Sequence, residues 1–457
     1  MDVQSYIADM IEKARVAQKE FETYSQEKVD QAVRAVGKAI FDEGDPLAKM
    51  AVEETHMGSY EDKIMKNKGK ATAVWNYLKG KKSVGIIRYL DDQGLVEVAH
   101  PKGVIGAITP VTNPVMTPMH NAMIALKGAN AIIIAPHPAG KYVGKKSCDI
   151  MRAALKEVGA PEDLIQCIEP EMISVESSAL LMGMADVCVA TGGPGMVKAA
   201  YSAGKPAYGV GAGNMQCILD KDADIVDAVP KIIRGRQYDN GVLCTCEQNV
   251  ICPEEKLDEV MAEFAKQGGY YIQEQENVDR LRDFVFPGGE LNKKIVGLTA
   301  HELAKQAGFD VPEDTKVLLA KAKGAGVADT FSKEKLFPVL AVYPYKEWKD
   351  AVDIAIANLE YEGKGHSTTV HSFTKENIEY AGVKIPVSRL LVNGIGSSGV
   401  GGAYTNSLVP TATLGCGSWG NNSISENLDY IHLINISRIA YTDNTRQIPT
   451  PEEVWAE

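Results

Sequence analysis

Helical periodicity dominates the N-terminal part of the chain. In two consecutive segments the apolar side chains recur every three or four positions, which is the pattern of a helix that buries one face. Gly44 marks the expected end of the second helix, and a third helical segment is predicted to run through Trp75. The two apolar faces comprise Tyr6, Met10, Ala14, Ala17 and Phe21, and Val29, Ala32, Val33, Val36 and Ile40.

The pattern then changes to that of strands. The segment "SVGIIRYLDDQGLVEVAHP" has two β-rich runs on either side of a polar turn, and it predicts a hairpin. Because the hairpin precedes the main α/β region, we expect it to form an arm rather than part of a core sheet.

Apolar runs and amphipathic helices alternate from residue 103 onward. "GVIGAIT", "NAIIIAP" and "ADVCVAT" are typical of buried strands, and the segments between them are typical of helices. This alternation predicts βαβ units and a parallel sheet, in which ligands bind at the carboxyl ends of the strands. A second α/β stretch covers residues 238–392, followed by glycine-dense loops and a strand-rich end that can pair with a neighbour or with another chain.

Composition and charge narrow the class of protein. The 457 residues allow two or three domains, each with its own core. The net charge of −12 argues against a nucleic-acid or anionic-membrane partner. The charged first segment does not resemble a signal peptide, and no apolar run is long enough to span a bilayer, so we expect a cytoplasmic protein.

The eight cysteines match no zinc spacing and include no Cys-x-x-Cys pair, so no metal site or disulfide framework is expected. Most of them lie in strand-like runs. Cys244 differs, because "YDNGVLC" places a turn-forming Asn-Gly directly before it, and an exposed thiol can act as a nucleophile. The alternative is that Cys244 and Cys246 are two small residues that fill a gap.

Further segments have the composition of binding loops. "ATGGPGMVKAA" follows a strand and opens a helix, as in phosphate-binding turns, although a plain tight turn fits equally well. Asn113 in "ITPVTNPVMTP" can donate to an oxyanion or simply make an Asn-Pro turn. "APHPAGK" can contact an adenosine ribose or be a solvent loop, and His366 can be an acid, a base or a local hydrogen-bond partner.

In their order along the chain, these pieces resemble the aldehyde dehydrogenase superfamily, and in particular its CoA-acylating branch. The resemblance covers nearly the whole chain. The segments that carry it are "TPVTNPVMTPMHNAMIALKGANAIIIAPHP", "ATGGPGMVKAAYSAGKPAYGVGAGN", "YDNGVLCTCEQNV", "EKLFPVL", "YEGKGHS" and "TLGCGSWGNNSISENL".

The resemblance implies an α/β fold with a Rossmann-type cofactor domain, an α/β catalytic domain and a β oligomerisation arm. The cofactor domain would comprise residues 1–83 and 100–236 with 396–430, and the catalytic domain residues 237–395. The arm would comprise residues 84–99 and 431–457. Members of the family form dimers or larger assemblies, so the resemblance also implies a homo-oligomer.

Site residues follow from the same resemblance, position by position. Cys244 corresponds to the catalytic thiol, Asn113 to the oxyanion-hole amide, and His366 to a histidine proposed to assist the CoA step. The residues that correspond to cofactor-binding positions are Thr109, Pro110, Pro136, His137, Pro138, Thr191, Gly192, Gly193, Gly209 and Glu334.

Two departures from the family pattern are informative. Gly209 stands where hydrolytic members carry a water-activating glutamate, which favours coenzyme A as the acyl acceptor, because a thiol needs less help to ionise than water does. After "APHP" no acidic residue follows to bind a ribose 2′-hydroxyl, whereas Lys141, Lys145 and Lys146 are present. These lysines favour NADP, with NAD as the alternative.

The resemblance to members that take short anionic aldehydes implies such a substrate, with sulfoacetaldehyde and succinic semialdehyde as the leading candidates. Such a substrate needs a cation or hydrogen-bond donors, for which Arg236, Ser397 and Ser398 are candidates. Arg234 and Arg236 can equally form helix salt bridges. A hydrolytic aldehyde dehydrogenase, an acetaldehyde- or butyraldehyde-type acylating enzyme, a cysteine hydrolase and a binding protein without catalysis are the competing interpretations.

Overall fold

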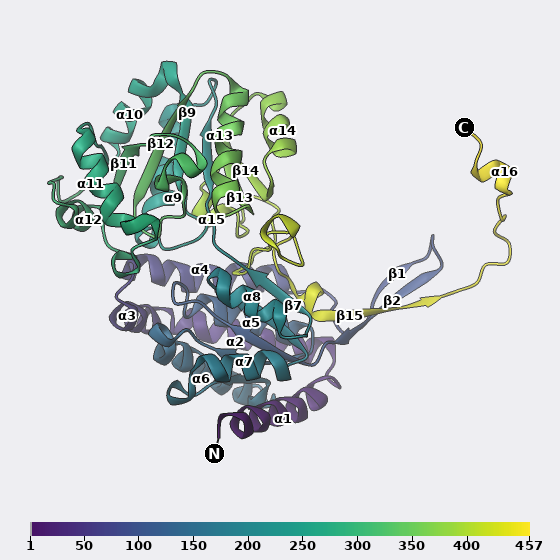
Figure 1. Ribbon diagram of the computed structural model, residues 1–457. Coiled ribbons are helices and arrows are strands. Elements are labelled where there is room, and N and C mark those ends of the chain that lie inside the picture. The colour runs from purple at the N-terminus through teal and green to yellow at the C-terminus, as the bar shows by residue number, and fades with distance from the viewer. Residues whose placement is uncertain (1) are drawn as a thin grey trace.

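The computed structural model describes residues 2–457 and contains two parallel sheets, each covered by helices, and a small antiparallel sheet (Figure 1). The first parallel sheet has the order β5-β4-β3-β6-β7, with β3 in the middle. Its strands are β3 (Val104–Ile108), β4 (Ala131–Ala135), β5 (Ile165–Cys167), β6 (Val187–Thr191) and β7 (Ala207–Val210). The α/β class and the parallel sheet predicted from the alternation are confirmed.

Eight helices surround this first sheet. Helices α1 and α7 pack against each other and against β3, whereas α2 packs against α4, α5 and α6. The faces predicted for the first two helices are confirmed, since Met10, Phe21, Val33 and Ile40 are buried. The helices are α1 (Val3–Phe21), α2 (Gln26–Asp42), α3 (Gly44–Thr55), α4 (Tyr60–Leu78), α5 (Met116–Lys127), α6 (Lys141–Glu157), α7 (Val175–Met184) and α8 (Pro194–Ser202).

The second sheet has seven parallel strands in the order β10-β11-β12-β9-β8-β13-β14. Its two faces bury separate apolar cores. The strands are β8 (Gln216–Leu219), β9 (Asn249–Pro253), β10 (Gly269–Tyr271), β11 (Val317–Lys321), β12 (Val339–Tyr345), β13 (Gly365–His371) and β14 (Val387–Val392). The helices are α9 (Ile225–Gln237), α10 (Leu257–Lys266), α11 (Gln275–Val285), α12 (Ala300–Ala307), α13 (Trp348–Tyr361), α14 (Lys375–Lys384) and α15 (Gly396–Gly399).

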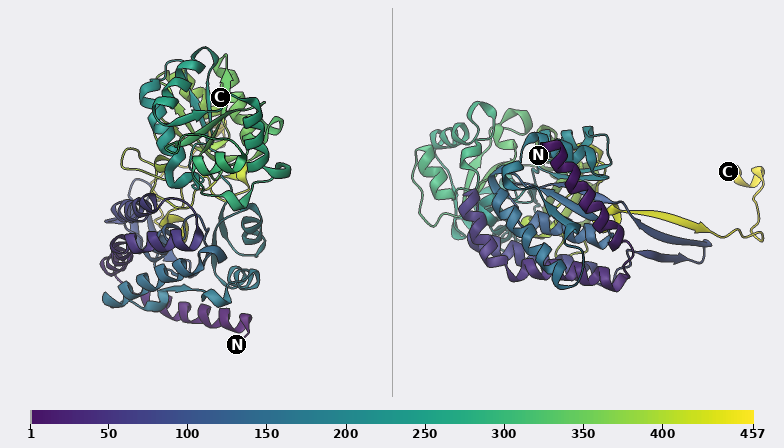
Figure 2. Two further views of the ribbon diagram at one scale, coloured as in Figure 1. Left: turned by 90° about the vertical axis from the view of Figure 1, so that its left-hand side faces the viewer. Right: turned by 90° about the horizontal axis from the view of Figure 1, so that it is seen from below.

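The predicted hairpin is confirmed as β1 (Gly85–Leu90) and β2 (Leu95–Pro101), which pair in antiparallel fashion. Strand β15 (Ile434–Ala440) adds to β2, and this sheet, together with the chain end that carries α16 (Pro451–Val454), projects away from both α/β bodies (Figures 1 and 2). Apolar side chains stay exposed along this arm and tail, namely Ile86, Tyr89, Ile436, Ile439, Tyr441, Ile448 and Trp455.

One domain boundary in the structure differs from the predicted one. The sequence assigned residues up to 236 to the first domain, but β8 pairs with β13 and β9 of the second sheet, and α9 packs into the same core. The glycine-rich segment 396–430 belongs to neither body alone. Val400 and Leu414 pack with Met215 at the junction, whereas Leu428 joins the core of the first body.

Candidate active site

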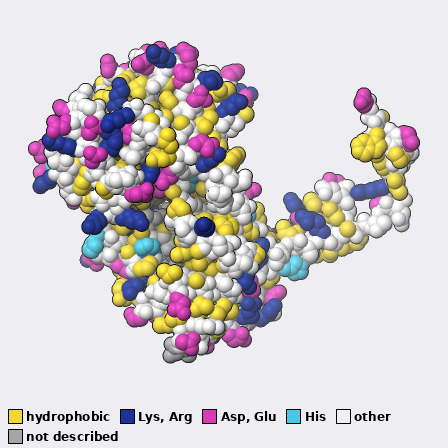
Figure 3. All heavy atoms as spheres, in the orientation of Figure 1, with side chains coloured by type: hydrophobic (Ala, Val, Ile, Leu, Met, Phe, Trp, Pro, Cys, Tyr) yellow, Lys and Arg dark blue, Asp and Glu magenta, His cyan; other side chains and the backbone are white. Residues whose placement is uncertain are grey.

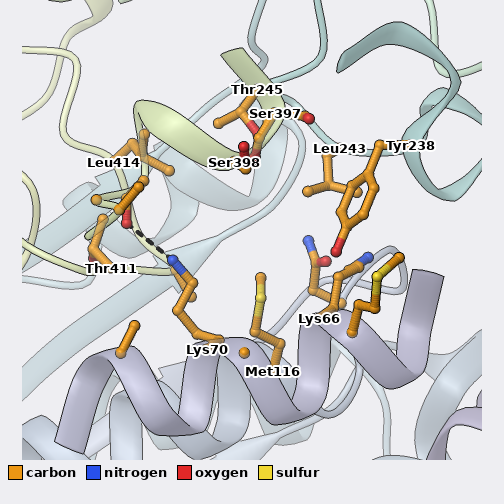
Figure 4. A pocket seen from close by; sticks show the side chains of 18 of the residues that line it. Lys66, Lys70, Met116, Tyr238, Leu243, Thr245, Ser397, Ser398, Thr411 and Leu414 are labelled. Atoms are coloured by element: carbon orange, nitrogen blue, oxygen red, sulfur yellow. Dashed lines mark hydrogen bonds between the residues drawn. The ribbon is translucent and has the colours of Figure 1, made fainter. Parts of the chain in front are cut away.

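A cavity of about 270 Å³ lies where the two bodies meet. Helix α4 forms one wall, and the segment before α5, the loop that carries Cys244 and the segment 397–414 form the others (Figure 4). Cys244, Asn113, Ser397 and Ser398 all line it, so the structure brings together predicted site residues from three segments that lie far apart in the sequence.

Cys244 reaches the cavity because the chain turns sharply after α9. Asp239, Asn240 and Gly241 have φ values of 51°, 52° and 77°, so three consecutive residues are left-handed. Asp, Asn and Gly are the residues that adopt this region most readily. The Asn-Gly turn predicted before the thiol is therefore confirmed, and the Asn240 amide holds it by donating to the Gly297 carbonyl at 2.9 Å.

The surroundings of the Cys244 thiol favour its neutral form. Burial raises its pKa well above the usual range, and the nearby Glu334 carboxylate raises it further, whereas the Arg389 guanidinium acts in the opposite direction. The thiol therefore needs added positive charge or a proton acceptor in the cavity before it becomes a nucleophile.

The Asn113 side chain faces the same cavity with an incomplete hydrogen-bond set. Its Nδ2 donates to Thr112 Oγ1 at 3.3 Å, and its buried Oδ1 has no partner in the described chain. The second Nδ2 proton has no acceptor among the described residues, and Asn113 lines the same cavity as Cys244, as an oxyanion donor would.

Two lysines of α4 also line the cavity, and the sequence reasoning missed both. Lys66 and Lys70 follow Lys63 at spacings of three and four, which is one face of a helix. The Lys70 ammonium donates to the Gly401 carbonyl at 2.9 Å. Burial lowers its pKa to about 8, and no carboxylate of the described chain offsets this shift. A row of lysines usually covers a solvated face, so only the packing of α4 shows that this row faces a cavity.

The expectation that Arg236 binds substrate is wrong. Its side chain is fully buried and does not line the cavity. The guanidinium donates to the carbonyl oxygens of Glu247, Gly241, Lys335 and Phe337 and so ties the Cys244 loop to the second body.

Arg234 forms a helix-surface interaction, as the alternative interpretation held. Its guanidinium pairs with Asp62 at 3.4 Å and lies over the Tyr238 ring.

His366 is not one of the residues that line the cavity. It is buried in β13, where its Nδ1 contacts Ser367 Oγ at 2.8 Å and its Nε2 has no partner among the described residues. Burial and the neighbouring Arg389 lower its pKa to about 3, so the imidazole is neutral at neutral pH. The expected part of His366 in the CoA step stays a prediction, and it would be played by a neutral imidazole.

Gly209 is not one of the residues that line the cavity. It belongs to β7, and a Cβ there would come within 2.8 Å of Val197 and Tyr201 of α8. The correspondence of Gly209 to the water-activating glutamate of hydrolytic members stays a prediction. None of the described residues that line the cavity is Asp, Glu or His, so its wall offers no carboxylate or imidazole as a base.

The expected cofactor residues gather at the carboxyl edge of the first sheet. Thr109 follows β3, Pro136 follows β4, and Thr191 ends β6, and these three strands are adjacent and parallel. Pro110, His137 and Pro138 complete the same loops. Gly192 and Gly193 precede α8, and a Cβ at Gly193 would meet no heavy atom within 4 Å.

This edge fits a dinucleotide. The strand order 3-2-1-4-5 is that of a doubly wound Rossmann sheet without its sixth strand, and its switch point, where such ligands bind, lies between β3 and β6. Helix α8 begins at Gly193 without a side-chain cap, so its first N–H groups are free to bind a pyrophosphate. The described residues contain no group of three or more His, Cys, Asp or Glu side chains that could hold a metal ion.

Glu334 lies near Cys244 but is not one of the residues that line the cavity. Its carboxylate accepts from the Gly213 N–H at 3.0 Å, and a Cβ at Gly213 would come within 2.3 Å of the Cys244 carbonyl. Burial and the neighbouring Glu362 raise the pKa of Glu334 to about 8. This carboxyl group can accept from a ribose hydroxyl that reaches the Cys244 segment.

Comparison with known proteins agrees with this arrangement. Residues 3–270 match the model of the aldehyde dehydrogenase family. The protein is 52% identical to an acetylating succinate-semialdehyde dehydrogenase of Clostridium kluyveri, and the match covers 98% of each chain. It is 40% identical to a sulfoacetaldehyde dehydrogenase of an Acholeplasma species, over 99% of this chain and 94% of that one.

A solved structure of an acetylating aldehyde dehydrogenase from Geobacillus thermoglucosidasius superimposes with a TM-score of 0.93 at 38% identity, over 98% of each chain. The chain belongs to the aldehyde dehydrogenase family. Within that family it is an acylating aldehyde dehydrogenase, an oxidoreductase. No helix in the described residues is both long and apolar enough to cross a membrane.

Proposed function

We propose that this protein interconverts a short anionic aldehyde and its CoA thioester, with a nicotinamide dinucleotide as redox partner, and that the aldehyde is succinic semialdehyde. The observation that carries the proposal is one cavity that holds a cysteine thiol, an amide donor and an ammonium without a carboxylate partner, and that has no carboxylate or imidazole among the described residues that line it.

Cys244 and Asn113 perform the first step. The Cys244 thiol first releases its proton to solvent in the cavity. The thiolate then adds to the aldehyde carbonyl, a C–S bond forms, and the carbonyl electrons move to oxygen. The Asn113 amide and the Cys244 backbone N–H donate to this oxyanion. The bound nicotinamide supplies the acceptor for the hydride that the adduct loses as its oxygen re-forms a carbonyl. Cys244 then carries an acyl thioester, which the CoA thiolate attacks, and Cys244 leaves as thiolate.

The composition of the cavity wall supports a thiol as the acyl acceptor. Water needs a base to attack a thioester at a useful rate, and no carboxylate or imidazole is found among the described lining residues. A thiol ionises far more readily and does not depend on such a base. The cavity therefore favours acyl transfer to CoA over hydrolysis.

Lys70 supports the anionic substrate. Its ammonium is held over the cavity by one carbonyl and has no carboxylate partner, so a substrate anion can complete its charge balance. Ser397 and Ser398 on the opposite wall can add hydrogen bonds. Succinic semialdehyde ranks before sulfoacetaldehyde because this chain is 52% identical to the succinate-semialdehyde dehydrogenase but only 40% identical to the sulfoacetaldehyde dehydrogenase.

For the dinucleotide we propose NADP as the first candidate and NAD as the second. Lys141, Lys145 and Lys146 at the start of α6 favour a second phosphate, although Lys145 already pairs with Asp149 at 2.7 Å. The Glu54 carboxylate, which accepts from the N–H groups of Tyr142 and Val143, opposes the binding of a second phosphate there.

We also propose a homodimer or larger homo-oligomer built through the arm. The antiparallel sheet and the tail beyond it leave Ile448 at 91% and Trp455 at 82% exposure. Figure 3 shows apolar and charged side chains side by side on this projecting part, which stands clear of the rest of the chain. A second copy is the partner proposed to cover it.

A single panel of assays tests the proposed function. Formation of reduced nicotinamide is followed with NADP or NAD, with and without CoA, over succinic semialdehyde, sulfoacetaldehyde, acetaldehyde and butyraldehyde. We expect turnover that requires CoA and is fastest with succinic semialdehyde. Equal rates without CoA would indicate a hydrolytic enzyme, and thioester cleavage without nicotinamide dependence would indicate a cysteine hydrolase.

Replacing Lys70 with methionine is expected to lower kcat/KM for succinic semialdehyde by at least about tenfold, because a charge-assisted contact is worth about 1.5–3 kcal/mol. The value for butyraldehyde, which has no anion, should change little. Wild-type kcat/KM for the anionic aldehyde, relative to butyraldehyde, should also fall as the pH rises through about 8, where Lys70 loses its proton.

Lys68 provides the matched control. It lies on α4 two residues before Lys70, its ammonium sits over the Phe41 ring, and it does not line the cavity. Lys68→Met therefore removes the same charge from the same helix without changing the wall. Equal losses in the two variants, or equal losses for both aldehydes, would reject Lys70 as the anion-binding residue.

A further inference from the structure

We propose that Lys66, anchored by Asp239, is a positioning residue that sets the Asn113 amide against the Cys244 thiol. The inference rests on the proposed oxyanion role of Asn113 and adds the device that holds the two groups of that site together.

The two halves of the proposed oxyanion site come from different bodies. Asn113 follows β3 of the first sheet, whereas Cys244 follows α9, which packs on the second sheet. Their separation therefore depends on how the bodies are held at the junction. An error of about 1 Å in such a separation can lower a rate by about 100-fold.

The Lys66 ammonium spans this junction. It contacts Asp239 Oδ2 at 2.5 Å and donates to the Thr112 carbonyl at 3.3 Å. Thr112 directly precedes Asn113, and Asp239 begins the left-handed turn that leads to Cys244. One ammonium thus joins the segment that carries the amide to the segment that carries the thiol, and Figure 4 shows Lys66 at this wall of the cavity (Figure 4).

Asp239 is a fixed anchor for this contact. Its side chain is fully buried, and its Oδ1 accepts from the Ser59 N–H at 2.8 Å at the start of α4. Its own N–H donates to Asp62 Oδ2 at 2.8 Å. The chain also approaches closely here, since a Cβ at Gly58 would come within 1.9 Å of Asp239 Oδ1. The turn before Cys244 is therefore fastened to the N-terminal part of α4 at several points.

Stability alone is a poor reason for this cluster. Burying charged groups costs free energy that their pairing often fails to recover. Asp239 also has two lysine partners where one would satisfy its charge, because Lys63 contacts the same Oδ2 at 3.0 Å. Lys63 and Lys66 differ in one respect: only Lys66 of this pair also contacts Thr112 and lines the cavity.

That difference provides a matched pair of variants. Lys66→Met and Lys63→Met each remove one ammonium from Asp239 and leave the other in place. We expect Lys66→Met to lower kcat by about 10- to 100-fold with a smaller change in the KM for aldehyde, and Lys63→Met to leave kcat within about threefold of wild type. Melting temperatures of both variants report whether the fold is kept, and Lys66→Gln serves as a second variant if Lys66→Met does not fold.

A double-mutant cycle with Asn113→Ala separates positioning from a general structural effect. If Lys66 acts through Asn113, then Lys66→Met should lower kcat by less than about twofold once Asn113 is alanine. Additive losses, or equal losses in Lys66→Met and Lys63→Met, would overturn the positioning role while leaving the oxyanion role of Asn113 intact. A silent Asn113→Ala would overturn both.

Discussion

Replacing Cys244 with alanine is expected to lower CoA-dependent turnover by at least about 10³-fold, because no other group can carry the acyl chain between the redox step and the thiol step. Reduced nicotinamide is measured with aldehyde, dinucleotide and CoA present. With aldehyde and dinucleotide but no CoA, intact-mass spectrometry should detect an acyl adduct on the wild-type chain and none on Cys244→Ala.

Cys246 is the natural control for this experiment. It lies two residues further on, is fully buried in an apolar cluster, and donates through its thiol to the Tyr238 carbonyl at 3.7 Å. Burial raises the pKa of its thiol to about 12, so it stays protonated. Cys246→Ala should therefore keep turnover within about threefold and cost mainly stability, as a small core truncation does. Normal activity in Cys244→Ala would refute the proposed mechanism.

Replacing Asn113 with alanine is expected to lower kcat by about 10²- to 10³-fold, which is the usual cost of removing one oxyanion donor. The amide contacts the substrate oxygen only when it bears charge, so kcat and kcat/KM should fall by similar factors. Steady-state kinetics with saturating CoA and dinucleotide measure this.

Asn113→Asp is the companion variant, because it keeps the volume of the side chain but replaces the donor with an acceptor. Its loss should be at least as large as that of Asn113→Ala. If Asn113→Asp retained most of the turnover, Asn113 would have only a packing role, and the structure's open amide would have to serve another ligand.

Much of the fold was predictable from local patterns. The opening helices, the hairpin and the alternating strands follow from side-chain periodicity, which is a property of a few neighbouring residues. The turn before Cys244 is equally local, because Asn240 and Gly241 tolerate the left-handed region. The loops after β3, β4 and β6 could be placed at one edge, since parallel strands end on the same side.

Other assignments failed because burial is decided by packing between distant segments. From the sequence, Arg236 was expected to bind substrate or to form a salt bridge on a helix. In the structure its guanidinium is surrounded by the carbonyl groups of residues 241, 247, 335 and 337. His366 follows two glycines like a loop residue, yet it lies inside β13. Strand β8 reads as the end of the first α/β unit, and only its pairing with β13 moves it to the second.

The sequence by itself determined the class of fold and predicted a reactive thiol and cofactor-binding loops, because each depends on neighbours within one stretch of chain. The tertiary structure alone decided which charged side chains line the cavity. Lys66 and Lys70 lie on a helix far from Cys244 in sequence, and only the closure of the two bodies turns their face toward the thiol and excludes carboxylates from the wall. Electrostatic environment is a sum over groups that are close in space, so a linear pattern does not contain it.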